Sequence, residues 1–197
     1  TSLVLLDEPF CSLDVDVRSR LRNELTLVLK SCSASALLVT HDPHEALAIC
    51  DRVAVMKDGV IQQYSTPSQI VNNPSNDFVA KFVLQKNVLP ISNYDGHYST
   101  PIGNINYLGN TILSDSSKYI FDIRSVFIVL DENGTSSVLA VEYRIDHYIL
   151  VVSIMDLKIR VYHDLDEKVN IGDKCSIRFD GHNHGLILPE KIQTFLV

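Results

Sequence analysis

Residues 3–14 read LVLLDEPFCSLD, and this stretch decides the fold of the first part of the chain. Four consecutive apolar residues, 3–6, run directly into the carboxylates of Asp7 and Glu8. A continuous apolar run without polar alternation is typical of a parallel strand that is buried on both faces. We therefore expect a buried strand whose carboxyl end presents two acids.

A helix, a second strand and a second helix are predicted to follow. Asp14 is a suitable N-cap for a helix through residue 30, because apolar residues recur there at helical spacing. Residues 36–39 read ALLV and predict another buried strand. Asp42 then has the position of an N-cap, with a proline after it and Glu45 completing a capping box. Buried strands that alternate with helices predict an α/β domain with a parallel sheet.

The chain changes character after about Gln85. Before it, the segments 52–56 and 60–64 predict a hairpin, and short helices are expected from Thr66 and over 77–84. Beyond it, short β-rich runs separated by turn residues replace the helical periodicity. These runs are 119–130, 138–145, 148–154, 157–162 and 175–179. They predict a small barrel or sandwich, so we expect two domains, 1–85 and 86–197.

Composition excludes several classes of protein. The chain has 24 acidic and 17 basic residues and a net charge of -7, which argues against a nucleic-acid binder and against adsorption to an anionic membrane. Its longest apolar runs, such as 148–152, are too short to span a bilayer. The four cysteines lack C-x-x-C spacing, so we expect free, mostly buried thiols in a reducing cytosol. The sequence opens on Thr1 rather than on methionine, and we interpret it as a fragment.

The two acids at the end of the first strand suggest phosphoryl chemistry. In P-loop nucleotide hydrolases an aspartate in this position holds Mg²⁺, and a neighbouring carboxylate can activate the attacking water. Taken alone, Asp7 and Glu8 are equally consistent with solvated acids at a strand end. Taken alone, His41 fits better a histidine that merely caps a strand.

The order of the motifs resembles that of the ATP-binding-cassette (ABC) ATPases. The motifs DEPF at 7–10, SLD at 12–14 and LVTHD at 38–42 are similar to the Walker B strand, the D-loop and the H-loop of that family. The resemblance implies an ATPase in which Asp7 binds Mg²⁺ through water, and Glu8 is the general base. It also implies that His41 contacts the γ-phosphate of ATP. Asp14 would communicate across an ATP-sandwiched dimer.

The rest of the chain resembles the importer branch of the family. Residues 51–61 look like the hairpin after the H-loop, and the motifs STP at 65–67, NP at 73–74 and FVAKFV at 78–83 resemble the tail of the maltose, spermidine, iron, sulfate and molybdate importers. Asn87 also suits that group, whose ATPase is followed by a TOBE domain. Ile123-Arg124 is an incomplete match to the Ile-Arg-Pro-Glu motif of that domain, and Gly172-Asp173 resembles a later turn. The expected fold is the C-terminal part of a P-loop ABC ATPase domain (α/β), followed by an all-β OB-like TOBE barrel.

Two motifs of the family are missing from the sequence. It contains neither the phosphate-binding loop G-x-x-x-x-G-K-[ST] nor the Ser-Gly-Gly signature. Backbone amides and the lysine of that loop supply most of the phosphate binding. We therefore expect this segment alone to be inactive and to bind ATP weakly.

Three functions compete at this point. The leading one is the ATP-hydrolysing, energy-coupling subunit of an importer for a small ion, either ferric iron or an oxyanion such as molybdate, tungstate or sulfate. Its implied partners are a second ATPase subunit, transmembrane permease subunits and, indirectly, a solute-binding protein. Its implied place is cytoplasmic, peripheral on the inner face of the membrane. The alternative is a non-enzymatic regulatory or dimerisation module whose TOBE domain binds a small ligand or its twin. A nuclear or repair ATPase is disfavoured by the importer-like tail and the acidic charge.

Two further features of the β-rich part are candidate binding sites. His182 and His184 form a His-x-His pair, but flanking glycines favour a surface turn over a metal site. Five basic residues could receive an oxyanion, although they are spread over several predicted strands. They are Arg124, Lys158, Arg160, Lys174 and Arg178.

Overall fold

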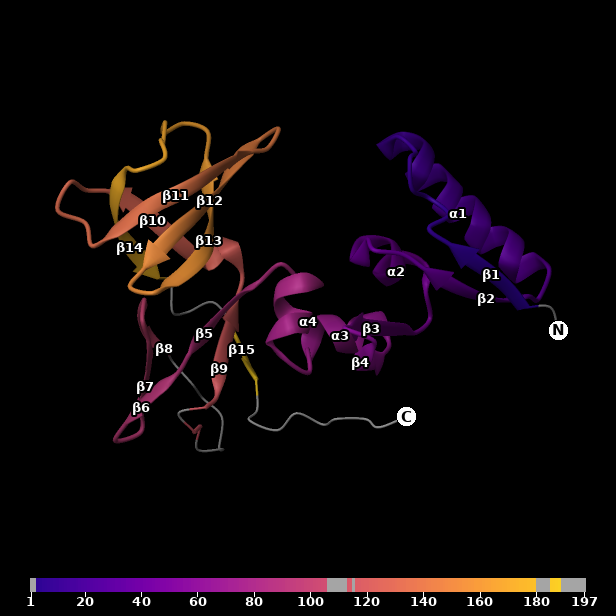
Figure 1. Ribbon diagram of the computed structural model, residues 1–197, viewed down its shortest axis with the longest axis horizontal. Helices are drawn as coiled ribbons and strands as arrows, with labels where there is room; N and C mark the ends of the chain where they lie inside the picture. The colour runs from indigo at the N-terminus through magenta and orange to yellow at the C-terminus, as the bar shows by residue number, and fades with distance from the viewer. Residues whose placement is uncertain (1–2, 106–112, 115, 180–184, 189–197) are drawn as a thin grey trace. The chain divides into compact units, whose positions relative to one another are not determined.

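A computed structural model describes residues 3–105, 113–114, 116–179 and 185–188. The described chain consists mostly of strands, with few helices, and it forms two compact units (Figure 1). The first unit contains residues 3–74 and the second begins at Ser75. The division thus falls at Pro74, ahead of the expected boundary between residues 85 and 86.

The first unit contains the predicted α/β elements. They are β1 (Leu3–Asp7), α1 (Val15–Ser31), β2 (Ser35–Val39), α2 (Pro43–Ile49), β3 (Val53–Lys57), β4 (Val60–Ser65) and α3 (Pro67–Asn72). β1 and β2 are parallel and α1 connects them, as the alternation of apolar strands and helix predicts. β3 and β4 form the predicted antiparallel hairpin. Thr66 caps α3 with a complete capping box that it shares with Gln69.

The prediction that β1 and β2 are buried on both faces is wrong for the described chain. Leu5 pairs with Leu37 and Asp7 with Val39, so these residues share one face of the two-stranded sheet. On that face Leu5 is 69% exposed and Leu37 57% exposed. No helix or strand among the described residues covers this face. The apolar side chains that the sequence places on it are therefore exposed in the described chain.

The described part of the second unit contains one α-helix, one 3₁₀ helix and two main sheets. Its elements are α4 (Asp77–Phe82), β5 (Asn87–Pro90), β6 (Ser92–Tyr94), β7 (His97–Thr100), β8 (Gly103–Ile105), β9 (Lys118–Phe121), η1 (Ile123–Ser125), β10 (Val126–Leu130), β11 (Ser136–Tyr143), β12 (His147–Ile154), β13 (Leu157–Asp164), β14 (Lys174–Phe179) and β15 (Leu186–Leu188). One sheet has the strand order β10-β14-β11-β12-β13, and another has the order β15-β9-β5. β6, β7 and β8 form a third, small meander.

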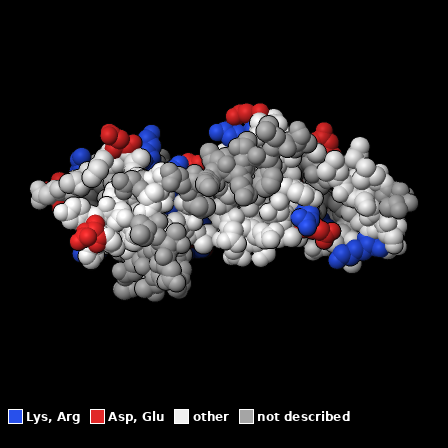
Figure 2. Space-filling model, turned by 90° about the horizontal axis from the view of Figure 1, so that it is seen from below, with Lys and Arg blue, Asp and Glu red and all other residues white. Residues whose placement is uncertain are grey.

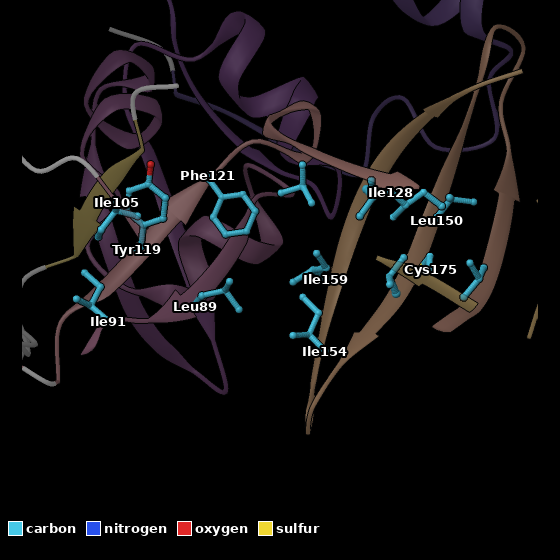
Figure 3. Close-up of a cluster of buried hydrophobic side chains, with 14 of the residues drawn as sticks. Leu89, Ile91, Ile105, Tyr119, Phe121, Ile128, Leu150, Ile154, Ile159 and Cys175 are labelled. Carbon is cyan, nitrogen blue, oxygen red and sulfur yellow. The ribbon is translucent and has the colours of Figure 1, made fainter. Parts of the chain in front are cut away.

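The larger core of the second unit lies between the two main sheets. Leu89 and Phe121, from β5 and β9, lie on the side that faces Ile154 and Ile159 from the five-stranded sheet (Figure 3). Leu89, Phe121 and Ile159 are each at most 2% exposed. Burial of such side chains stabilises the unit by about 1.5–3 kcal/mol each. The second unit therefore has its own hydrophobic core, as an independent domain requires.

The described strands form no closed sheet, so closure of the expected closed or nearly closed OB-like barrel is not shown. In the five-stranded sheet β10 contacts β13, but among the described residues no strand pairing joins them. The β-rich run 119–130 contains two strands, β9 and β10, because Asp122 interrupts it. The Asp122 carboxylate accepts a hydrogen bond from the backbone amide of Arg124 and caps a 3₁₀ turn there. The chain consequently leaves β9 for β10 and passes from one sheet to the other.

Helix α4 belongs to the second unit rather than to the first. Its Ala80 is fully buried in a small apolar cluster with Ile120 and Leu188. Asp77 accepts a hydrogen bond from Lys118 Nζ at 3.0 Å. These contacts explain why the unit begins at Ser75.

Candidate nucleotide site

The register of β1 and β2 brings the predicted catalytic residues to one edge of the sheet. Asp7 pairs with Val39 at the carboxyl ends of the two strands. The amide of Glu8 donates to the Val39 carbonyl oxygen at 2.8 Å and extends the pairing by one residue. Asp7 and Glu8 therefore lie beside the turn that contains Thr40 and His41. This is the edge at which ligands bind in parallel α/β sheets.

Glu8 and His41 are directly bonded. Glu8 Oε1 accepts a hydrogen bond from the His41 backbone amide at 2.8 Å and lies 2.8 Å from His41 Nδ1. The hydrogen bond from the Glu8 carboxylate, together with its negative charge, raises the pKa of His41 above 6.5. One carboxylate thus fixes both the backbone and the ring of the histidine, although the His41 side chain is 79% exposed.

The backbone at Glu8 has an unusual conformation. Its φ is 46°, in the left-handed region that costs a residue with a side chain about 1–2 kcal/mol. The same turn places Ser12 at φ 65° and has a hydrogen bond from the Cys11 amide to the Glu8 carbonyl oxygen. Strained residues of this kind cluster at functional sites, where the surrounding structure holds them.

Asp14 is the N-cap of α1, as its position predicts. Its Oδ1 accepts from the Val17 amide at 2.9 Å. The carboxylate is thus oriented by the helix that follows it. Its expected contact across a dimer stays a prediction.

The predicted capping box of α2 is wrong. Asp42 does cap the helix, because its Oδ1 accepts from the His44 amide at 2.9 Å. Glu45 instead accepts from Thr40 Oγ1 at 2.6 Å, and Thr40 Oγ1 in turn accepts from the Asp42 amide. The threonine hydroxyl has therefore taken the place that the sequence assigned to the Glu45 carboxylate. His44 is exposed, as expected of a solvated residue.

Sequence reasoning missed Arg18. Its guanidinium lies between the two turns of the site: Nη2 donates to the Leu13 carbonyl oxygen at 3.1 Å, Nη1 is 3.8 Å from Asp42, and Nε is 3.9 Å from Glu45. A signal was present, since a cation in the first turn of a helix is disfavoured by the helix dipole unless it has partners.

The described residues offer a limited ligand set for a metal. Among them, no three His, Cys, Asp or Glu side chains gather as a metal-binding group. Asp7 is exposed at the strand end and supplies one hard oxygen donor, which is the type Mg²⁺ prefers. That donor fits a magnesium ion held mainly by water and phosphate oxygens. The assignment of Mg²⁺ to Asp7 stays a prediction.

Two of the five candidate basic residues of the second unit have partners of their own among the described residues. Arg160 contacts Gln85 and Glu142, while Arg124 stacks over the ring of Tyr162. On the described part of the face shown in Figure 2, blue and red atoms are interspersed and form no continuous basic stripe. His182 and His184 lie outside the described residues.

The cysteines differ in part from the prediction. All four are free, but only Cys175 is buried. Cys11 and Cys32 are exposed, because one lies in the turn after Glu8 and the other ends α1. Among the described residues, no helix has the length and apolar character needed to cross a membrane.

The relatives of the chain are ATP-binding subunits of importers. It is 32% identical over 191 residues to the spermidine/putrescine import ATP-binding protein PotA of Mesoplasma florum, a match that covers 90% of this chain and 52% of that protein. It is 37% identical over 142 residues to the Fe(3+) ions import ATP-binding protein FbpC of Fusobacterium nucleatum (68% of this chain, 36% of that protein). It is 33% identical over 153 residues to the sulfate/thiosulfate import ATP-binding protein CysA of Pseudomonas syringae pv. tomato (76% of this chain, 47% of that protein).

The matches cover only part of each relative. The chain spans about half the length of the curated relatives it matches, or less. No protein-family model matches it.

Proposed function

We propose that the chain is part of the ATP-hydrolysing, energy-coupling subunit of an ABC importer. The observation that carries the proposal is the bonded pair of Glu8 and His41 at the carboxyl ends of two adjacent parallel strands. Import ATP-binding proteins that match most of the chain support the same assignment.

The chemistry of the pair suits phosphoryl transfer to water. The Glu8 carboxylate can orient and deprotonate a water molecule, as a general base must. Because the pKa of His41 is raised, its ring more often carries both protons, so that Nδ1 donates to Glu8 and Nε2 can donate to a phosphate oxygen. Asp7 would hold Mg²⁺ through water, and the metal would neutralise charge on the phosphates.

Several parts of the proposal come from the relatives and the resemblance. The activity requires a phosphate-binding loop, which this sequence does not contain. We propose that the ATPase works as a homodimer in which Asp14 faces the second subunit. The dimer would lie on the cytoplasmic face of the membrane and act on permease subunits fed by a solute-binding protein. We also propose that the second unit is the TOBE domain.

We further propose that the transported solute is a small ion. The sequence favours a small ion, and relatives named for Fe(3+) and for sulfate/thiosulfate agree with that choice. A relative that matches 90% of the chain is named for spermidine/putrescine instead. Uptake of labelled ferric iron, sulfate, molybdate and spermidine by cells with and without the gene would distinguish these solutes.

A non-enzymatic role is the second candidate. The separate core of the second unit favours a regulatory or dimerisation module. ATP hydrolysis by the protein that carries this chain separates the two candidates.

The decisive experiment is Glu8→Gln in that protein. Loss of the general base is expected to lower steady-state ATP turnover about 10²–10⁴-fold while ATP binding stays nearly intact. Glu24→Gln is the matched control, because Glu24 is exposed on α1 and pairs only loosely with Arg20 at 3.8 Å. Near-normal turnover in Glu8→Gln would remove Glu8 from the catalytic role.

A further inference from the structure

We propose that Arg18 is a positioning residue that ties the turn 8–14 to the turn 40–42. The inference rests on the proposed function, since it concerns how the Glu8 and His41 pair is held for ATP hydrolysis. It adds a residue that touches neither the reacting atoms nor the metal. Its basis is the set of contacts that Arg18 makes from the first turn of α1.

On one side, Arg18 holds the end of the turn that follows Glu8. Its Nη2 donates to the Leu13 carbonyl oxygen at 3.1 Å. The next residue, Asp14, caps the helix on which Arg18 stands. The end of the turn therefore accepts two hydrogen bonds from α1: the Val17 amide donates to the Asp14 carboxylate, and the Arg18 guanidinium donates to the Leu13 carbonyl oxygen.

On the other side, Arg18 faces the two carboxylates that organise the His41 turn. Its Nη1 lies 3.8 Å from Asp42 Oδ2 and its Nε lies 3.9 Å from Glu45 Oε1. Both distances are those of loose ion pairs rather than hydrogen bonds. The Nε atom is buried and has no hydrogen-bond partner among the described residues. A shift of Glu45 by less than 1 Å would convert this ion pair into a hydrogen bond.

Glu45 needs Arg18 because Glu45 is almost completely buried. Its side chain is 4% exposed, and a buried carboxylate is costly unless it is paired. Its two partners here are Thr40 Oγ1, at 2.6 Å, and the guanidinium of Arg18. Removal of Arg18 leaves the carboxylate with one neutral donor. We then expect Glu45 to turn toward water and to release Thr40.

The release of Thr40 would reach His41 directly. Thr40 Oγ1 accepts the Asp42 amide at 3.1 Å, and the His41 amide between them donates to Glu8 Oε1. The chain of contacts thus runs from Arg18 through Glu45 and Thr40 to the amide that holds Glu8. A two-sided contact of this kind lets one guanidinium set the distance between the two catalytic turns.

Amide hydrogen exchange on the full chain tests the positioning role without ATP. In Arg18→Ala, exchange at His41 and Asp42 is expected to speed up roughly tenfold, while the paired amides of β1 and β2 stay unchanged. Arg18→Lys keeps one cation but not the fork of donors, so its rates should lie between those of Arg18→Ala and the unsubstituted chain. Arg20→Ala is the matched control, because Arg20 lies on the same helix and pairs only with exposed Glu24.

Two exchange results would overturn the inference. The first is an unchanged rate at His41 in Arg18→Ala. The second is an equal acceleration of all amides of the first unit, which would mean that Arg18 contributes only to general stability.

Kinetics on the protein that carries the chain then separates this inference from the proposed function. Arg18→Ala and Glu45→Gln are each expected to lower kcat about tenfold with KM for ATP changed less than about twofold, since they disturb the catalytic pair rather than ATP binding. The double variant should be no worse than either single variant, because both break the same connection. Absence of turnover in the unsubstituted protein would overturn the proposed function and the catalytic meaning of Arg18 with it. Full activity of Arg18→Ala would overturn the inference alone.

Discussion

Asn87 holds the backbone of Arg160 with both ends of its amide. Its Nδ2 donates to the Arg160 carbonyl oxygen at 2.6 Å, and its Oδ1 accepts from the Arg160 amide at 2.8 Å. The two residues are 73 positions apart and lie on β5 and β13, which belong to different sheets. The Asn87 side chain thus makes with Arg160 the pair of hydrogen bonds that the backbone of a neighbouring strand would make. These two bonds connect the sheet that contains β5 to the five-stranded sheet that contains β13.

Asn87→Ala should destabilise the second unit by about 2 kcal/mol, because it removes two hydrogen bonds and leaves backbone groups of Arg160 unpaired. Urea unfolding followed by circular dichroism measures the change. Asn133→Ala is the matched control, since Asn133 is exposed in the turn before β11 and should change stability by less than about 0.5 kcal/mol. Equal midpoints for the two variants would show that the Asn87 bonds contribute nothing.

The bond between Glu8 and His41 predicts a pH dependence. Glu8 raises the pKa of His41 in the folded chain above the unfolded value of 6.5. The stabilisation from the pair is therefore fully present below pH 6.5 and is lost as pH rises through the folded pKa. In Glu8→Gln the pKa of His41, measured by NMR titration, should fall toward 6.5. An unchanged pKa in Glu8→Gln, with Glu24→Gln as control, would mean that the carboxylate does not interact with the ring in solution.

The chain of 197 residues alone should bind Mg-ATP weakly and hydrolyse none. Glu8, His41 and Asp7 are present, but the loop amides and lysine that bind phosphates in this class of ATPase are absent from the sequence. Isothermal titration calorimetry checks the affinity, and phosphate release checks the activity. A micromolar dissociation constant would contradict the prediction.

The position of α4 predicts how the second unit can be separated from the first. A chain that starts at Ser75 retains the Ala80 contact with Ile120, whereas one that starts at Lys86 exposes Ile120. Exposure of that apolar surface should make the shorter chain less stable by about 2 kcal/mol. Urea midpoints of residues 75–197 and 86–197 make the comparison. Equal midpoints would show that α4 is dispensable.

The second unit is predicted to self-associate. Tyr143 is 70% exposed and Ile145 is fully exposed at the turn between β11 and β12, next to the charged side chains of Arg144 and Asp146. Sedimentation of residues 75–197 should show a dimer that Ile145→Lys weakens about tenfold and that Asn133→Lys leaves intact. A strictly monomeric species at high concentration would refute this.

The sequence predicted best those elements whose local signals agree with their packing. Helix α1 has the expected cap at Asp14 and the expected apolar spacing, and it runs over Val15–Ser31 as predicted. The hairpin of β3 and β4 and the helix after Thr66 also follow from turn residues and a capping box. The same local logic brought Asp7, Glu8 and His41 to one sheet edge, because parallel strands align their carboxyl ends.

The elements that escaped prediction depend on contacts between distant residues. The run 119–130 has uniform β character, and only the capping by Asp122 divides it. The boundary at Pro74 depends on Ala80 packing against Ile120, which no local pattern reveals. Glu45 does not complete the expected capping box, because its carboxylate accepts a hydrogen bond from Thr40 and pairs with Arg18 instead. In each case the structure depends on which of several possible contacts a side chain makes, and the local sequence does not distinguish these contacts.

The pairing of Asp7 with Val39 has a consequence for how such a gene can change. Exchanges among leucine, isoleucine and valine in β1 keep the pleat and leave the strand end where it is. Loss or gain of a single codon in β1 would turn Asp7 to the opposite face and carry Glu8 away from His41. Codon gains in the turn between α1 and β2 would leave that edge untouched, because this turn lies outside both strands, within the 33 positions that separate Glu8 from His41. In β1 and β2, apolar substitutions should therefore be tolerated, whereas insertions and deletions should not. Insertions and deletions should be tolerated in the turn between α1 and β2.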